Sequence, residues 1–187
     1  GKLYQLMKKN NMKAIQLLMM NKKISGPVPK DWHVPTDAEF TILTTYLGGG
    51  AVAGDKLKAS STDSVPWNGT NSSGFTALPS GVRFGGGFGS YFDYLGNRTY
   101  FWSSSEGGPG DSWCRFLRSD YAGVNRADIN QANGWSVRCL RSVSPSESSD
   151  ADGTIYTDDY TGNDGTKYDS VKIGNQIWIN ENLKETK

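Results

Sequence analysis

The sequence predicts an α+β domain in which turns and short strands outnumber helices. Glycine accounts for 23 of the 187 residues, well above its usual share of about 7%, and this favours turn-rich β structure over a helical bundle. Apolar and polar residues alternate in "RTYFWSSS" and "DSWCRFL", as they do in half-buried strands. A single strong helix signal, a capping box, precedes an apolar stripe. The length suits one domain, or one domain with an appendage.

Two helices are expected, both near the start of the chain. Residues 1–24 contain all four methionines and carry apolar residues at roughly helical spacing. They predict an amphipathic helix that covers the core, the alternative being a helix that binds a partner or a membrane surface. Thr36 and Glu39 form the capping box of the second helix. Its apolar stripe and its end are expected at Phe40, Leu43, Leu47 and Gly48.

The last third of the chain has turn and linker signals. Asn133-Gly134 predicts a tight turn before "WSVRCLR", and the Ser/Asp/Glu-rich residues 142–153 predict a linker. Gly174-Asn175 lies between "SVKI" and "QIWI", which predicts a two-residue β-hairpin. Because a bare hairpin is marginally stable in water, we expect this one to pack on the domain that precedes the linker.

Charge and hydropathy exclude two classes of partner. A net charge of +1 provides no broad basic surface for nucleic acid. No apolar run approaches the roughly 20 residues of a membrane-spanning helix. Cys114 and Cys139 fit neither a disulfide scaffold nor a zinc site. Two buried thiols are favoured over a single disulfide.

No catalytic or metal site is expected, and no cofactor. His33 is the sole histidine, so a Ser-His pair would have to use it, and a cluster of His ligands is excluded. Its position before a helix cap favours a structural role. Several carboxylates gather near the linker, but their spacing is not that of a calcium-binding loop. We expect them to be solvated: Asp150, Asp152, Asp158, Asp159 and Asp164.

Several motifs occur together in an order that resembles a known family. "DWHVPTDAEFTILTTYLGG", "WNGTNSSGFTALPSGVR", "YFWSSSE" and "NGWSVRCLR" resemble the Fibrobacter succinogenes major paralogous domain family across residues 31–141. The resemblance implies a C-type-lectin-like fold: two helices with a small, mostly antiparallel sheet and long loops. Enzymes that generate formylglycine share that fold and use a cysteine pair. No such pair with neighbouring bases is evident here, so we expect no enzymatic activity.

The resemblance also bears on domain organisation. Residues 1–141 are expected to form the C-type-lectin-like domain and residues 142–153 the linker. The hairpin segment 154–187 resembles the beginning of the same family domain. The favoured interpretation is that it completes this domain, as a circularly permuted or swapped start. The alternative is a second tandem copy that is cut short.

The resemblance implies a binding surface between residues 114 and 130. In some proteins of this fold, diversity-generating retroelements randomise the last segment through codons that cannot encode Lys, Glu, Gln, Met or Trp. None of these five types occurs at the twelve candidate ligand-binding positions, which are Cys114, Phe116, Arg118, Ser119, Asp120, Tyr121, Gly123, Asn125, Ala127, Asp128, Ile129 and Asn130. The alternative is a surface loop of no special purpose.

The expected function is therefore ligand binding. We expect a diversified display protein, a receptor-binding protein or adhesin, at a cell or virion surface or outside the cell. Its ligand would be a protein or glycan on another cell or host, and copies could associate through the tail or the Met-rich helix. The alternative is a structural cell-surface or carbohydrate-binding domain without diversification. Trp113, Leu117, Val124 and Trp135 are expected to be buried. Six side chains are expected to share one exposed face: Ser119, Asp120, Tyr121, Asn125, Asp128 and Asn130.

Overall fold

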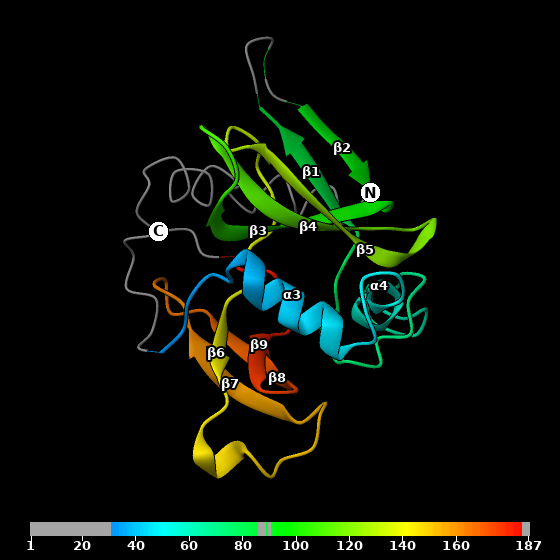
Figure 1. The fold of residues 1–187 in the computed structure, drawn as a ribbon. Helices are drawn as coiled ribbons and strands as arrows, with labels where there is room; N and C mark the ends of the chain where they lie inside the picture. The colour runs from blue at the N-terminus through cyan, green and yellow to red at the C-terminus, as the bar shows by residue number, and fades with distance from the viewer. Residues whose placement is uncertain (1–30, 86–88, 90, 185–187) are drawn as a thin grey trace.

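The computed structural model describes residues 31–85, 89 and 91–184, and this part of the chain is mostly β structure (Figure 1). Its nine strands form two sheets, and two short helices lie beside them. The helices are α3 (Asp37–Tyr46) and α4 (Ala53–Leu57). A 3-10 turn, Pro145–Glu147, lies in the connection from the strand Leu140–Ser142 to the strand Ile155–Thr161.

The strands divide between the sheets in chain order. The five-stranded sheet has the order β2-β1-β3-β4-β5. It consists of β1 (Ser80–Phe84), β2 (Tyr91–Leu95), β3 (Arg98–Glu106), β4 (Asp111–Arg118) and β5 (Tyr121–Asn130). The four-stranded sheet has the order β6-β9-β8-β7. It consists of β6 (Leu140–Ser142), β7 (Ile155–Thr161), β8 (Lys167–Ile173) and β9 (Gln176–Ile179).

The predicted C-type-lectin-like α+β fold, with two helices, a small sheet and long loops, is wrong. The five-stranded sheet instead curls into a half-barrel, and a second sheet lies below it (Figure 1). Residues 119–130 contain the whole of strand β5, so the segment is not a surface loop. Burial alternates along residues 125–130 of this strand, whereas buried Gly123 and half-buried Val124 interrupt the alternation in its first half. The helix expected at residues 1–24 lies outside the described residues.

Helix α3 runs between the two sheets (Figure 1), and its start confirms the predicted capping box. The Thr36 hydroxyl accepts a hydrogen bond from the Glu39 amide (3.2 Å), and the Glu39 carboxylate accepts one from the Thr36 amide (2.8 Å). Gly48 follows the helix with a φ of 101°, a left-handed conformation that glycine adopts at little cost. The expected stripe of Phe40, Leu43 and Leu47 is buried.

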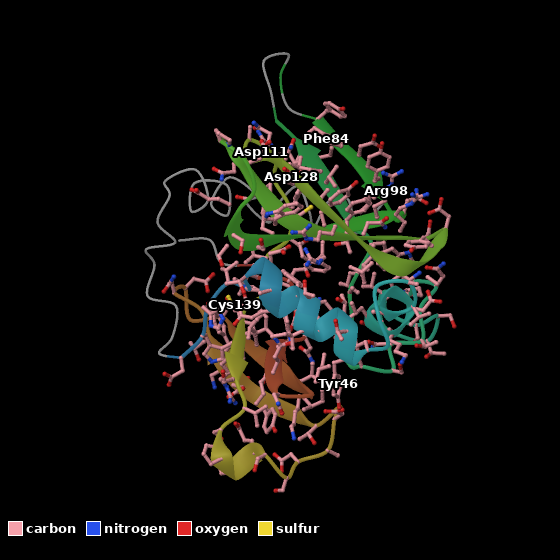
Figure 2. All side chains as sticks on the ribbon, viewed as in Figure 1. Tyr46, Phe84, Arg98, Asp111, Asp128 and Cys139 are labelled. Carbon is pink, nitrogen blue, oxygen red and sulfur yellow. The ribbon has the colours of Figure 1, made fainter. Side chains whose placement is uncertain are left out.

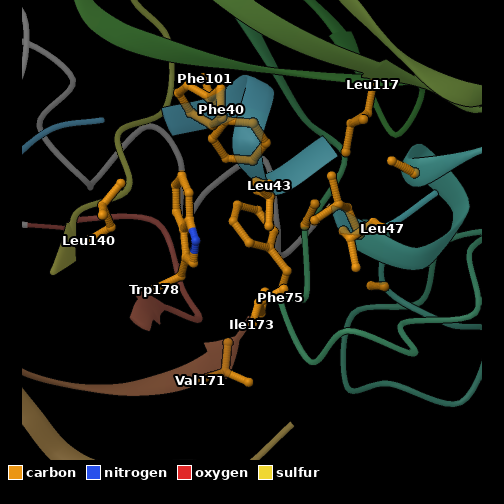
Figure 3. Close-up of a cluster of buried hydrophobic side chains, with 14 of the residues drawn as sticks. Phe40, Leu43, Leu47, Phe75, Phe101, Leu117, Leu140, Val171, Ile173 and Trp178 are labelled. Atoms are coloured by element: carbon orange, nitrogen blue, oxygen red, sulfur yellow. The ribbon is translucent and has the colours of Figure 1, made fainter. Parts of the chain in front are cut away.

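One hydrophobic cluster connects both sheets to α3 (Figure 3). The Trp178 ring of β9 lies 5.3 Å from Phe40 of α3 and 5.6 Å from Phe75, measured between ring centroids. Phe75 in turn meets Phe101 of β3 edge to face at 5.5 Å. Aromatic rings bury large apolar areas and dominate core energetics. The position of the five-stranded sheet is therefore fixed by packing that includes the last strand, β9.

A buried arginine adds polar contacts between the segment before β1 and the last strand, β9. Arg138 is fully buried and donates hydrogen bonds to the carbonyls of Phe75 (2.9 Å), Thr76 (3.0 Å) and Ile179 (2.8 Å). Its Nε donates to the Asn182 side chain at 2.9 Å. Burial lowers the pKa of Arg138 to about 9, so the group stays charged at neutral pH. Removing it would leave buried carbonyls without a donor, which is costly.

The segment expected to be a linker is tied to the four-stranded sheet. Arg141 makes two hydrogen bonds to the Glu147 carboxylate, at 2.8 and 2.7 Å, and a third to Asp159 at 2.9 Å. The ammonium group of Lys172, a buried residue of β8, donates to the carbonyls of Ser148 and Asp150. Linker-like composition is therefore compatible here with an ordered connection. Among the described residues, no helix has the length and apolar character needed to cross a membrane.

Candidate functional site

All twelve candidate ligand-binding residues lie on the β4–β5 hairpin. Three belong to β4, Ser119 and Asp120 form the turn, and the other seven belong to β5. The structure therefore brings the predicted residues together in one element. That element is a hairpin at the edge of a sheet.

The hairpin divides the candidate residues between its two faces. Cys114 pairs with Ala127 and Phe116 with Asn125, and these side chains lie on the face that we call the inner face. That face carries a buried cluster of Val82, Tyr100, Trp102, Cys114 and Trp135. Asp128 pairs with Trp113, and Asn130 pairs with Asp111. Because side chains alternate along a strand, these two point to the opposite face, which also carries Arg126, the ion-pair partner of Asp37 in α3. The prediction that six exposed residues share one face is therefore wrong.

Two of the candidate residues lie in the interior. Cys114 has no exposed surface, and desolvation raises the pKa of its thiol to about 12, so it is neutral and unreactive at pH 7. Gly123 is also buried, and a Cβ atom there would lie 2.4 Å from the Gly50 carbonyl. These residues hold the hairpin in place and offer no side chain to a ligand. Cys114 and Cys139 are buried thiols in separate clusters, which confirms that expectation.

The residues expected to support the surface are buried to different extents. Leu117 and Trp135 are each 1% exposed, as predicted. Val124 is half-buried against the main cluster, and Trp113 is only half-buried. The Arg126 guanidinium covers Trp113 at 3.4 Å from the ring centroid and forms an ion pair with Asp37 (3.0 Å). A cation–π contact thus takes the place of full burial at Trp113.

Aromatic rings on the inner face form a continuous stack. Trp102 and Trp135 lie 4.0 Å apart, Trp135 and Tyr100 4.8 Å, and Tyr100 and Phe116 4.8 Å, between ring centroids. Exposure rises along the stack, from buried Trp135 to half-buried Phe116. Phe116 is therefore a candidate contact that rests on a rigid base.

The turn of the hairpin, residues 118–121, which we call the tip, is held from below. The ammonium group of Lys58, which is 1% exposed, donates to the carbonyls of Arg118 (3.2 Å) and Tyr121 (3.0 Å). The Ser119 amide donates to the Asn97 carbonyl at 2.9 Å. The Asn68 side chain donates to the Ser119 carbonyl. Three separate segments therefore fix the backbone of the tip, and sequence reasoning missed this role of Lys58.

Two side chains of the tip are exposed and two are half-buried, although its backbone is fixed. Asp120 and Tyr121 are exposed, Tyr121 by 41%. Arg118 donates two hydrogen bonds to the Asp120 carboxylate, at 2.8 and 2.6 Å. These bonds lower the pKa of Asp120 and raise that of Arg118. A fixed backbone with exposed charged and aromatic side chains is the arrangement that binding surfaces use, because little order is lost when a ligand binds.

Sequence reasoning also missed an arginine next to the tip. Arg98, at the start of β3, lies directly opposite Arg118 across the β3–β4 pair. Figure 2 shows Arg98 at the end of the five-stranded sheet that is far from Asp111 and Asp128. The two arginines are twenty positions apart in the sequence, and only the strand register brings them together.

The described residues contain no group of three or more His, Cys, Asp and Glu side chains that is arranged to hold a metal ion. The carboxylates near the linker are bound by protein donors. Asp150 accepts from the Tyr156 hydroxyl, and Asp152 accepts from the Gly174 amide, both at 2.8 Å. His33 contacts Glu39 at 2.7 Å, which fits a structural role at the start of α3.

A family model described as the Fibrobacter succinogenes major domain matches residues 1–141. The chain belongs to this family. The family resemblance expected from the motifs is thereby confirmed. The match ends within β6, so strands β7 to β9 lie beyond it. Neither the curated proteins nor the solved structures contained a match to the chain.

Proposed function

We propose that this member of the Fibrobacter succinogenes major domain family is a ligand-binding module that uses the tip and the adjoining inner face. One observation carries the proposal: buried Lys58 and two neighbouring segments fix the tip backbone, while the side chains of Asp120 and Tyr121 remain exposed. The tip has the sequence Arg-Ser-Asp-Tyr. Arginine and tyrosine are common energetic anchors in protein interfaces, and serine and aspartate add adaptable hydrogen bonds.

The ligand in this proposal is a protein or glycan on another cell or host. The module would act as a receptor-binding protein or adhesin, displayed on a cell or virion surface or released outside the cell. The proposal includes no catalytic step. It is supported by residue types and geometry at the tip, and it does not depend on a lectin-like fold.

Diversification of the hairpin is a separate part of the proposal. If a retroelement varies this segment, the changes are expected at the tip and at Phe116, Asn125, Ala127 and Ile129. Cys114 and Gly123 are expected to vary least, because their sites are enclosed. A near-identical copy of the hairpin's coding sequence beside a reverse transcriptase gene would support this part. Its absence from the complete genome would contradict it.

The proposal is tested by binding to an array of glycans and cell-surface ectodomains. The tip variant is Arg118→Ala/Asp120→Asn/Tyr121→Ala. A control on the β7–β8 hairpin, Ile155→Ala/Asp158→Asn/Lys167→Ala, removes a similar exposed ion pair and an apolar residue of similar exposure, 46% for Ile155. We expect the control to retain the ligand of the wild-type protein and the tip variant to lose affinity by about tenfold or more. A tip variant that keeps every wild-type interaction would contradict the proposal and favour a structural domain.

A further inference from the structure

Two arginines face each other at the end of the inner face near the tip. Arg98 on β3 and Arg118 on β4 are direct cross-strand partners, and like charges in such positions repel. One carboxylate, Asp120, lies within ion-pair distance, and it binds Arg118. Among the described residues no carboxylate forms an ion pair with Arg98, although its charge, after the hydrogen bonds from Arg118, also contributes to the lowered pKa of Asp120. This end of the sheet therefore has one more cationic group than it has anionic partners.

The Arg98 guanidinium is held in place by aromatic groups. Its central carbon lies 4.0 Å from the centroid of the Tyr94 ring, and Nη1 donates to the Tyr100 hydroxyl at 3.4 Å. Stacking uses the flat face of a guanidinium and leaves N–H groups at its edge available. The edge of such a group matches a carboxylate, which it binds through two parallel hydrogen bonds. Arg98 is thus oriented for an anion before any ligand arrives.

The surroundings favour a carboxylate over a neutral sugar. Tyr94 and Phe116 each have one ring face already occupied, by Arg98 and Tyr100 respectively. A ligand at this position would therefore meet guanidinium groups more readily than uncovered aromatic ring faces. The half-buried rings also lower the local polarity, which strengthens an ion pair. Exposed Tyr121 beside the pair supplies further contact area for a polypeptide.

We propose that Arg98 and Arg118 form an anion-binding site that recognises a carboxylate-bearing segment of a protein partner. The inference rests on the proposed function, because it names the chemistry of the ligand at the same tip. Arg98 makes the main contact. Asp120 competes with the ligand for Arg118.

The site is tested on the full chain with fluorescein-labelled oligoglutamate and with oligoglutamine of equal length. The variants are Arg98→Gln and, as a control, Arg126→Gln. Arg126 is also stacked on an aromatic ring, but it is more exposed than Arg98 and lies on the opposite face of the hairpin. We expect wild-type protein to bind oligoglutamate and not oligoglutamine. Arg98→Gln should weaken that binding by about tenfold, whereas Arg126→Gln should change it by less than about twofold.

A second variant, Asp120→Asn, is expected to strengthen oligoglutamate binding instead of weakening it. Removing the competing carboxylate frees Arg118, so oligoglutamate binding should become several-fold tighter. Weaker binding in this variant, no effect of Arg98→Gln, or equal losses in Arg98→Gln and Arg126→Gln would each overturn the site. Preference for a heparin oligosaccharide over oligoglutamate would overturn the assignment to a protein partner. Thermal unfolding of each variant verifies that it is folded.

The two proposals can fail separately. If the tip variant loses its array ligand while Arg98→Gln and wild type bind oligoglutamate equally, the anion site is wrong and the proposed function stands. If Arg98→Gln loses oligoglutamate but no array ligand depends on the tip, the anion site is supported and the proposed function is wrong.

Discussion

The two sheets differ in how their strands are buried. All four residues of β9 in the four-stranded sheet are buried, whereas exposed and half-buried residues alternate along much of β5 in the five-stranded sheet. Trp178 of β9 contacts rings from α3 and from the segment before β1, but Tyr121 of β5 lies 41% exposed. The difference separates a supporting region from a displaying one. Substitutions are expected to affect stability in the first and binding in the second.

Buried cations contribute to both regions in a similar way. Arg138 binds backbone carbonyls that join the chain end to the segment around Phe75, and Lys58 binds the carbonyls of the tip. Lys172 does the same for the connection around residue 148. A cation with several donors can satisfy carbonyls that lack partners in a strand or helix. In both regions, a buried side-chain cation thus holds segments of the backbone in place through their carbonyls.

The largest effect is expected from removing residues 154–187. The truncation removes β7, β8 and β9, and it uncovers Phe40, Phe75 and the Arg138 site. We expect loss of cooperative thermal unfolding, followed by circular dichroism. A truncated protein that melts like the full chain would support the alternative that the tail belongs to a second tandem copy.

Next in size is the substitution Trp178→Ala. The side chain has no exposed surface, so its loss leaves a cavity, and we expect unfolding in denaturant to become easier by about 3–5 kcal/mol. Phe92→Ala is the control, because Phe92 is an aromatic residue that is 49% exposed. The control should change stability by about 0.5 kcal/mol or less. Similar losses in the two variants would remove the distinction between the regions.

The substitution Lys58→Met connects the two regions. It retains most of the buried side-chain volume but leaves the carbonyls of Arg118 and Tyr121 without this donor. We expect a loss of about 1–3 kcal/mol and faster hydrogen exchange at the Ser119 amide. Unchanged exchange at the tip would contradict the role assigned to Lys58.

The sequence predicted local structure better than the arrangement of the sheets. The capping box at Thr36, strands β3 and β4, and the Gly174 turn all depend on neighbouring residues, and each is present. The fold class was wrong because strand order and register depend on contacts between distant residues. In the first half of β5, buried Gly123 is followed by half-buried Val124, and this interrupts the period-two pattern that residues 125–130 show.

The candidate surface could be predicted only in part, because its geometry also depends on strand register. The segment was identified from its residue types, but the division between its faces needed the β4–β5 register. Lys58 lies in the polar stretch "GDKLKAS" and has no sequence signal that distinguishes it from a solvated lysine. The Arg98–Arg118 pair likewise depends on the register of β3 and β4.

A smaller effect is expected from acid at the connection between β6 and β7, within the four-stranded sheet. The hydrogen bonds from Arg141 hold the pKa of Glu147 at about 2, below its usual value of 4.5. Because the folded state favours the charged form, this contribution is present above pH 4.5 and is lost as the pH falls toward 2. Glu147→Gln should lower the free energy of unfolding at neutral pH by about 1 kcal/mol. The difference from wild type should vanish near pH 2, and a difference that does not change with pH would contradict the assignment.

The smallest effects on folding are expected at the tip, and saturation libraries can compare it with β9. One library varies residues 118–121 singly, and the other varies residues 176–179 singly. Protease resistance of the displayed variants measures the folded fraction at every position. We predict that most tip variants remain folded and that most β9 variants do not. Tip variants that lose the fold as often as β9 variants would contradict the division of the molecule into a supporting sheet and a displayed binding surface.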